Sequence, residues 1–284
     1  EEYGNAVDAY NAFLRYSPNS PRSPYVKNKI VTAYRILEYS QEVFFARQKL
    51  FLNYRPGSAW WNTPGNEAVH EDAHQMAEEA LRSNFNSITR RAESEEDSEL
   101  YSEAVVLGKT YLETFPEELY AYYIRWNTAL VLDTRLKRFK DALQEYLTIS
   151  LVYNTRTYEQ FAREKGLSTV KDAAENAIVV ADSLVYRERM EEGLAKEIER
   201  KDASEKTALP LTPGESWLAM AYDNYIKLFP FDSNTPRVLA NAGALYYVHN
   251  QFTEALKYFK TLVKYFPKSQ EVQRGQYSIL ESYF

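Results

Sequence analysis

The residues best suited to chemistry lie in the segment VHEDAH, residues 69–74. This segment contains His70, Glu71 and His74 in the spacing H-E-x-x-H. On a helix, that spacing puts two imidazoles on one face, where they could hold a zinc ion beside a glutamate acting as a base. The apolar periodicity of the region is helical, so metal-assisted hydrolysis is one hypothesis for this chain.

The neighbouring residues weaken that hypothesis. The motif resembles that of zincin metallopeptidases, whose helices usually carry uncharged residues between the ligands, whereas this one carries Asp72. No H-x-x-G-x-x-H extension follows. The glutamates at 93, 95 and 96 could supply a third ligand, but acidic residues are so common in this chain that their presence does not identify one. Two alternatives stay open: an adventitious or structural metal on His70 and His74, or a plain helix with a buried stripe of Val69, Ala73, Met76, Ala77 and Ala80.

The rest of the chain offers little catalytic chemistry. It has no cysteine, and therefore no disulfide, thiol nucleophile or cysteine-ligated zinc. It contains no P-loop, no G-x-S-x-G and no G-x-G-x-x-G motif. His249 stands alone near an expected helix end and is interpreted as a turn residue. We therefore expect a non-enzymatic protein without a cofactor and without a metal.

Composition narrows the class of partner. The 284 residues carry a net charge of -6 and no dominant basic block, which argues against a nucleic-acid partner. No run of 18 apolar residues exists, so no transmembrane segment is predicted. The aromatic fraction of 15%, with 24 tyrosines, is the unusual total and calls for a structural explanation.

One sequence template recurs along the chain. A small or apolar residue is followed by an often aromatic residue four positions later, an apolar residue at seven and a proline at twelve, as in Ala255, Phe259, Leu262 and Pro267. The copies end near 18, 56, 116, 154, 230 and 267, with Asn154 replacing the proline once. Endings 18 and 56 are 38 residues apart, as are 116 and 154, so the longer gaps indicate insertions within 57–116 and at about 186–212. A fixed period of this length predicts a solenoid of helix pairs.

The best copy resembles the tetratricopeptide repeat (TPR), in which W-x2-L-G-x2-Y precedes A-x3-F and P. Its first helix is predicted to carry Leu239, Gly243 and Tyr246. The resemblance implies an all-α fold, an α-solenoid of antiparallel helix pairs with about six repeats, half repeats included at both ends, forming one TPR domain over residues 1–284. Helix starts are predicted at Ser23-Pro24, Thr63-Pro64, Thr212-Pro213 and Thr235-Pro236, with a capping box from Thr212 to Glu215. The repeated core positions account for most of the aromatic residues.

The same resemblance locates a partner-binding surface. TPR domains line a concave groove with fixed positions of each first helix, and that groove suits an extended peptide or a partner helix. The matching positions are Ile124, Asn127, Val131 and Arg135 in the 123–156 copy, and Arg237, Ala244, Tyr247 and Val248 in the 236–269 copy. The residues do not match the carboxylate clamp of chaperone-binding TPRs.

The spacing and the "YxPxS"-like endings look like those of tandem-TPR proteins of the bacterial envelope, of the type of the BamD assembly lipoproteins. This resemblance implies a scaffold that binds a partner protein in the periplasm, at the outer membrane or outside the cell, although the cytoplasm stays open. The alternative is a structural subunit of a filament or another large extracellular assembly, formed by self-association. Half repeats at both ends lead us to expect a longer polypeptide, or ends closed by partners.

Two adjacent tryptophans, Trp60 and Trp61, follow one repeat ending, in AWWNTPG. Packing of one ring against the next helix is the simplest interpretation. Because adjacent side chains rarely point the same way, the other ring is a candidate anchor for a partner. The two tryptophans therefore join the predicted binding residues.

Overall fold

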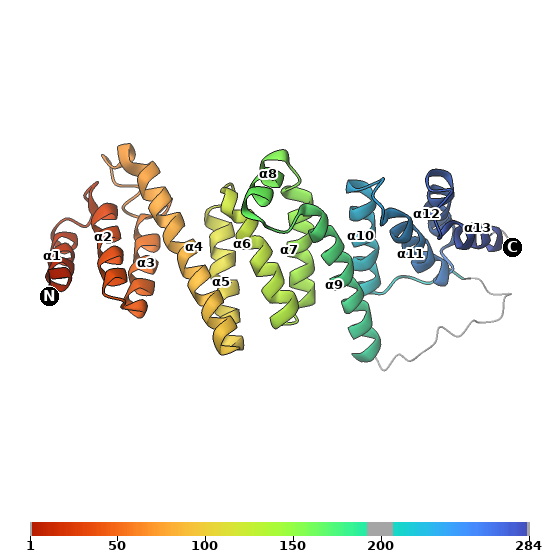
Figure 1. The fold of residues 1–284 in the computed structure, drawn as a ribbon, viewed down its shortest axis with the longest axis horizontal. Coiled ribbons are helices and arrows are strands. Elements are labelled where there is room, and N and C mark those ends of the chain that lie inside the picture. The colour runs from red at the N-terminus through yellow and green to blue at the C-terminus, as the bar shows by residue number, and fades with distance from the viewer. Residues whose placement is uncertain (1, 192–206, 283–284) are drawn as a thin grey trace. The chain divides into compact units, whose positions relative to one another are not determined.

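All regular elements of the described chain are helices. The computed structural model describes residues 2–191 and 207–282, and in these ranges it contains no strand. The predicted all-α class is therefore confirmed for these residues. Figure 1 shows the helices in chain order, with labels that are kept throughout.

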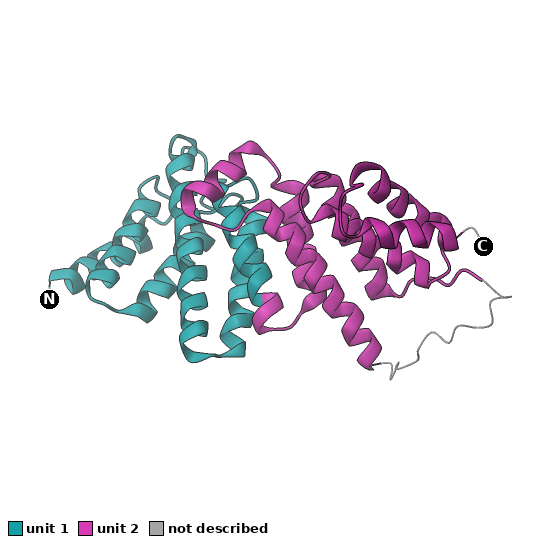
Figure 2. Cartoon of the chain, turned by 45° about the vertical axis from the view of Figure 1, so that its right-hand side comes forward, with its two compact units in different colours: residues 1–131 teal, residues 132–284 magenta. Residues whose placement is uncertain are grey.

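The chain divides into two compact units, residues 1–131 and residues 132–284, coloured separately in Figure 2. A π-helical turn, η2 (Val131–Arg135), spans the division between them. The helices of the first unit are α1 (Glu2–Tyr16), α2 (Ser23–Ile36), α3 (Ser40–Tyr54), a 3-10 turn η1 (Glu67–Val69), α4 (His70–Glu95), α5 (Ser98–Thr114) and α6 (Leu119–Leu130). Those of the second are α7 (Phe139–Val152), α8 (Arg156–Lys165), α9 (Val170–Glu191), α10 (Pro213–Leu228), α11 (Thr235–Val248), α12 (Phe252–Tyr265) and α13 (Val272–Glu281).

Helices that follow one another in the sequence pack side by side within each unit. In the first unit each of α1 to α6 packs against the next, and in the second the succession runs α7, α9, α10, α11, α12 and α13. Helix α8 is inserted into the connection between α7 and α9, which pack directly on each other. This arrangement of neighbouring helix pairs is that of an α-solenoid. The number of repeats, their TPR type and the single domain over 1–284 stay predictions.

Four of the six predicted repeat endings share a backbone turn. After α1, α5, α10 and α12, a backbone N–H donates to the carbonyl of the residue three positions earlier. The residue three positions further on then donates to the carbonyl of that donor residue. The pairs are Ser20 to Ser17 and Ser23 to Ser20, Glu118 to Phe115 and Ala121 to Glu118, Asp232 to Phe229 and Thr235 to Asp232, and Ser269 to Phe266 and Val272 to Ser269. Two endings depart from this pattern. At 56 the first bond forms, from Ser58 to Arg55, but Asn62 then donates to the Ser58 carbonyl from four residues on; at 154 Thr155 donates to Tyr153 and α8 begins at once.

Aromatic rings fill the core, as the repeat template predicts. Tyr111, Tyr122, Tyr146 and Tyr225 are the largest fully buried side chains. The small residue of the template is also explained: an added Cβ at Gly243 would lie 2.6 Å from the ring of Phe259. Glycine therefore lets α11 and α12 approach closely.

The predicted helix starts are partly confirmed. Thr212 caps α10, and the capping box with Glu215 is present. At α2 and α11 proline occupies the first turn, but Ser23 and Thr235 do not cap; their hydroxyls donate backward to the carbonyls of Ser17 and Phe229, at 2.8 and 2.6 Å. These bonds tie each new helix to the end of the previous one.

The start predicted at Thr63-Pro64 is wrong. Residues 55–66 form a series of turns, and α4 begins only at His70, after η1. The hydroxyl of Thr63 donates to the carbonyl of Ala59 at 3.0 Å rather than capping a helix. The region of the first predicted insertion, within 57–116, contains most of these turns together with η1, α4 and α5.

The second insertion, at about 186–212, lies partly outside the described residues. Helix α9 continues to Glu191, so the start of this insertion is helical, and residues 192–206 are not described. Across the described helices, none combines the length and the apolar character that crossing a membrane would need.

Candidate partner-binding site

The two histidines of the H-E-x-x-H motif contact different groups. The ring of His70 stacks on Trp61, with centroids 4.0 Å apart, and its Nε2 donates to the Trp61 carbonyl at 2.9 Å. The Nε2 of His74 lies 2.8 Å from a carboxylate oxygen of Glu118. Within the described residues no three histidines, cysteines or acidic residues are placed to hold a metal ion. The geometry therefore gives the metallopeptidase and metal-site alternatives no support.

Both tryptophans of the 55–66 turns are packed against the first unit. Trp60 is 3% exposed, donates from Nε1 to the Ser20 carbonyl at 2.9 Å and meets the ring of Tyr54 edge to face. Trp61 is partly buried by its stacking on His70. The buried side chain of Asn66 fixes the turns by donating to the Trp60 carbonyl at 2.9 Å. Trp60 thus has almost no surface for a partner, and Trp61 keeps some.

The predicted residues of the 123–156 copy lie at different depths. Ile124 is fully buried and Val131 is nearly so. Asn127 is half-buried and donates to the carbonyl of Tyr123 at 2.8 Å, while Arg135 is exposed at the end of η2. Only the last two of these four can reach a partner directly.

The predicted residues of the 236–269 copy share one face of α11. Arg237, Ala244 and Val248 follow each other at helical spacing, and the first and last are exposed. Tyr247 lies beside them and donates from its hydroxyl to Glu281 at 2.8 Å. Helix α11 therefore presents a continuous stripe of predicted binding residues from its first turn to its last.

Arg237 also lines a cavity of about 460 Å³ between α9, α10 and α11. We call it the α9–α11 cavity. Its lining combines acidic, amide, basic and apolar side chains, namely Glu175, Asn176, Ile178, Val179, Asp182, Tyr222, Tyr225, Asn234, Arg237, Val238 and Asn241. Donors and acceptors alternate with apolar surface, so the cavity can bind a group that carries both, such as a peptide backbone with its side chains.

Opposite charges act together on one wall of this cavity. Burial raises the pKa of Tyr222 to about 12, the Asp182 carboxylate adds to this rise, and Arg237 and a hydrogen bond with Asn241 oppose it. The Tyr222 hydroxyl is therefore neutral at pH 7. A cation and an anion that act on the same hydroxyl give the cavity polarity without a strong net charge.

The other end of the cavity is held by an ion-pair network. Lys171 lies 2.6 Å from Asp232, which also accepts from the Tyr225 hydroxyl at 2.7 Å. Burial alone would raise the pKa of Asp232, but hydrogen bonds from Lys171, the Asn234 backbone and Tyr225 outweigh it and lower that pKa to about 2. The network fixes α9 against the α10–α11 turn and so fixes the shape of the cavity.

Sequence reasoning missed the α9 side of this cavity. Asn176 and Asp182 belong to a helix that the repeat template did not identify, because the template follows second helices and α8 interrupts the spacing.

His249 is placed in a turn, as predicted, but its side chain is buried. Its Nε2 lies 3.0 Å from the carboxylate of Glu215, the capping-box residue of α10. The residue therefore has a packing environment that its isolated position in the sequence did not suggest.

Comparison of the chain with protein-family models and with curated proteins finds no match.

Proposed function

We propose that this chain is a non-catalytic scaffold of the TPR type that binds an extended segment of a partner protein along α9 and α11. The observation that carries the proposal is the α9–α11 cavity, which opens beside the stripe of Arg237, Ala244 and Val248 on α11. Cavity and stripe together form a surface long enough for several residues of a peptide.

The chemistry of this surface supports a peptide ligand. Arg237 can pair with an acidic side chain and Asp182 with a basic one, while Asn176 and Asn241 can exchange hydrogen bonds with peptide groups. Val179 is 62% exposed at the same cavity and offers an apolar contact. Such a mixture discriminates between sequences, because a mismatched partner leaves a charge unpaired.

The resemblance to tandem-TPR envelope proteins supports a location in the periplasm, at the outer membrane or outside the cell. In this setting the scaffold would hold its partner protein while a multiprotein complex assembles. Fractionation of source cells tests the location independently of the binding surface, since a protein confined to the cytoplasm would contradict it.

Photo-crosslinking tests the surface directly. Val179 is replaced by the photoreactive residue p-benzoylphenylalanine, and the matched control carries it at Val106 on α5, which is equally exposed at 62%. We expect ultraviolet light to produce a covalent adduct with a protein at position 179 but not at 106. Charge reversal by Arg237→Glu should remove the adduct, whereas Lys268→Glu, at an exposed site outside the cavity, should keep it.

The identity of the adduct decides between the candidate functions. A heterologous protein in the adduct supports the scaffold. An adduct of two copies of this chain supports the alternative of a self-assembling structural subunit. Equal crosslinking at 179 and 106, or an adduct insensitive to Arg237→Glu, contradicts a specific site at the α9–α11 cavity.

A further inference from the structure

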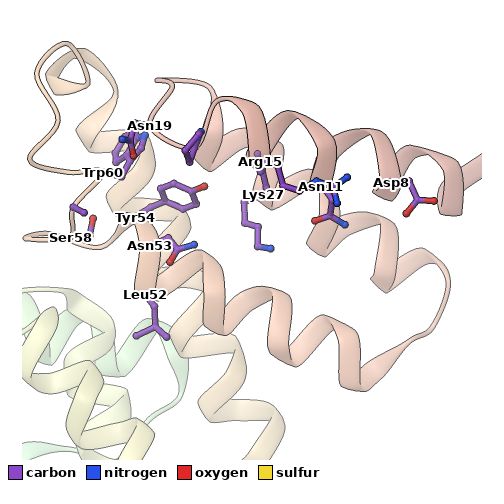
Figure 3. Close-up of a pocket in the computed structure, with 13 residues that line it drawn as sticks. Asp8, Asn11, Arg15, Asn19, Lys27, Leu52, Asn53, Tyr54, Ser58 and Trp60 are labelled. Atoms are coloured by element: carbon purple, nitrogen blue, oxygen red, sulfur yellow. The ribbon is translucent and has the colours of Figure 1, made fainter.

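A second cavity, in the first unit, is lined by side chains that include two donors, Lys27 and Tyr54, without a hydrogen-bond partner within residues 2–191 and 207–282. It occupies about 680 Å³ between α1, α2, α3 and the turns that hold Trp60, and we call it the α1–α3 cavity. Figure 3 shows its lining residues. They are Asp8, Asn11, Leu14, Arg15, Pro18, Asn19, Lys27, Leu52, Asn53, Tyr54, Ser58, Ala59 and Trp60.

Lys27 is the most informative of these residues. It lies on the inner face of α2, in line with Ile30 and Val31, and it is only 8% exposed. In the part of the chain that the structure describes, its ammonium group makes no hydrogen bond and no ion pair. Burial lowers the pKa of Lys27, and the charge of Lys49 lowers it further. Because most of the Lys27 side chain is buried, its charge is partly desolvated and has no anion beside it among the described residues, which is unfavourable.

Tyr54 provides a second donor in the same place. The side chain is 3% exposed, and in the described residues its hydroxyl has no hydrogen-bond partner. Burial raises the pKa of Tyr54 to about 12, so the hydroxyl stays protonated at pH 7 and can donate. In Figure 3 the Lys27 and Tyr54 side chains turn toward the same space, with Asn11 and Arg15 on its α1 side.

We infer that the α1–α3 cavity is a binding site for a carboxylate group, which accepts hydrogen bonds from the Lys27 ammonium and the Tyr54 hydroxyl. An ammonium group can only donate, so its partner must be an acceptor, and an anion also compensates the charge. The lining contains two cations, Arg15 and Lys27, and one anion, Asp8, which leaves one positive charge. Lys49 adds a further positive charge near Lys27, and the apolar part of the lining favours an anion attached to an apolar body, such as a carboxylic acid, over inorganic phosphate.

The remaining volume indicates what carries the carboxylate. A space of about 680 Å³ falls in the usual range of ligand sites, roughly 300–1,000 Å³, and far exceeds one carboxylate. Leu14, Pro18 and Trp60 supply apolar surface for the body of the ligand. The group can belong to a small apolar carboxylic acid or to the C-terminal residue of a peptide. The site lies in the other unit from the α9–α11 cavity, so this inference does not rest on the proposed function.

A stability measurement separates a binding role from a structural one. Lys27→Met keeps the unbranched side chain and removes the unpaired charge, so we expect a higher Tm in carboxylate-free buffer. The matched control, Lys29→Met, changes an exposed lysine of the same helix and should leave the Tm unchanged. A lower Tm for Lys27→Met would assign Lys27 a structural role and overturn the inference.

A binding measurement tests the ligand class. The indole N–H signal of Trp60 is followed by nitrogen-15 NMR during titration with 3-phenylpropionate and with the peptide acetyl-Gly-Ala-Phe, and the Trp217 signal of α10 serves as an internal control. We expect one acid or both to shift the Trp60 signal alone. The amide of each probe and inorganic phosphate should not.

The variants complete the test. Lys27→Met should weaken binding of the acids about tenfold or more, because a hydrogen bond to a charged group is lost, and Lys29→Met should bind normally. Response to the small acid alone identifies a small-molecule ligand, and response to the peptide acid identifies a chain terminus. The inference fails if neither acid binds, if amides or phosphate bind as well as the acids, or if Lys27→Met binds like the unsubstituted chain.

Discussion

Replacement of each tryptophan in the 55–66 turns by alanine should have very different effects on stability. Trp60 is almost fully buried, and a ring of this size buries about 200 Å². At about 25 cal/mol per Å² this corresponds to about 5 kcal/mol, of which alanine retains a small part. Loss of the hydrogen bond to the Ser20 carbonyl adds about 1 kcal/mol. We therefore expect Trp60→Ala to lower the free energy of unfolding by about 4–5 kcal/mol.

Trp61→Ala should cost much less, about 1–2 kcal/mol, because the ring is only partly buried and its main contact is the stacked His70. Urea denaturation followed by circular dichroism at constant pH measures both values. Trp60→Phe is the intermediate control, since it keeps an aromatic ring but removes the Nε1 donor. Equal losses for the two alanine variants would refute the assignment of Trp60 to the core and Trp61 to the margin.

Two further predictions concern packing and pH. Gly243→Val should lower the free energy of unfolding by about 1–3 kcal/mol, because even a Cβ at this position would contact Phe259. The control Gly4→Ala has open space around it and should leave stability unchanged or raise it. Thermal unfolding measures both effects. Asp232→Asn should lose about 1 kcal/mol at pH 7, after allowance for the partial exposure of the Lys171 pair. The Asp232 pKa is depressed to about 2, so its contribution is full above about pH 4 and disappears as the pH falls through 2. Urea titrations at pH 7 and pH 2 should therefore show a difference between the variant and the unsubstituted chain only at pH 7.

The repeat endings were predictable because they depend on neighbouring residues. A proline twelve positions after the small residue stops the helix, and the following residues form the same pair of turns at four endings. The helix starts were less predictable, although the local signal was similar. Ser23 and Thr212 both precede proline, yet only Thr212 caps its helix, because the Ser23 hydroxyl finds the carbonyl of Ser17 instead. The choice depends on where the previous helix ends in space.

The binding candidates were harder to predict for a related reason. A lysine side chain is normally solvated, so the amino-acid sequence of α2 does not by itself indicate that Lys27 is buried. Its helical register beside Ile30 and Val31 was the available signal, and it became meaningful only when α1, α3 and the Trp60 turns enclosed the same space. The predicted groove positions show the converse, since Ile124 occupies a groove position of the template and is fully buried.

Glu215 makes one contact that the local sequence predicts and two that depend on how the helices pack. Its role in the capping box follows from four consecutive residues and was predicted correctly. The same carboxylate also lies 3.0 Å from His249 and 3.4 Å from Arg189, residues that no local pattern connects to it. For Glu215, the local sequence therefore determines the capping contact, while packing of neighbouring helices determines its remaining partners. Both proposed sites are of the second kind, since each draws its polar groups from three helices, and their tests accordingly rely on variants that change a side chain without changing a helix.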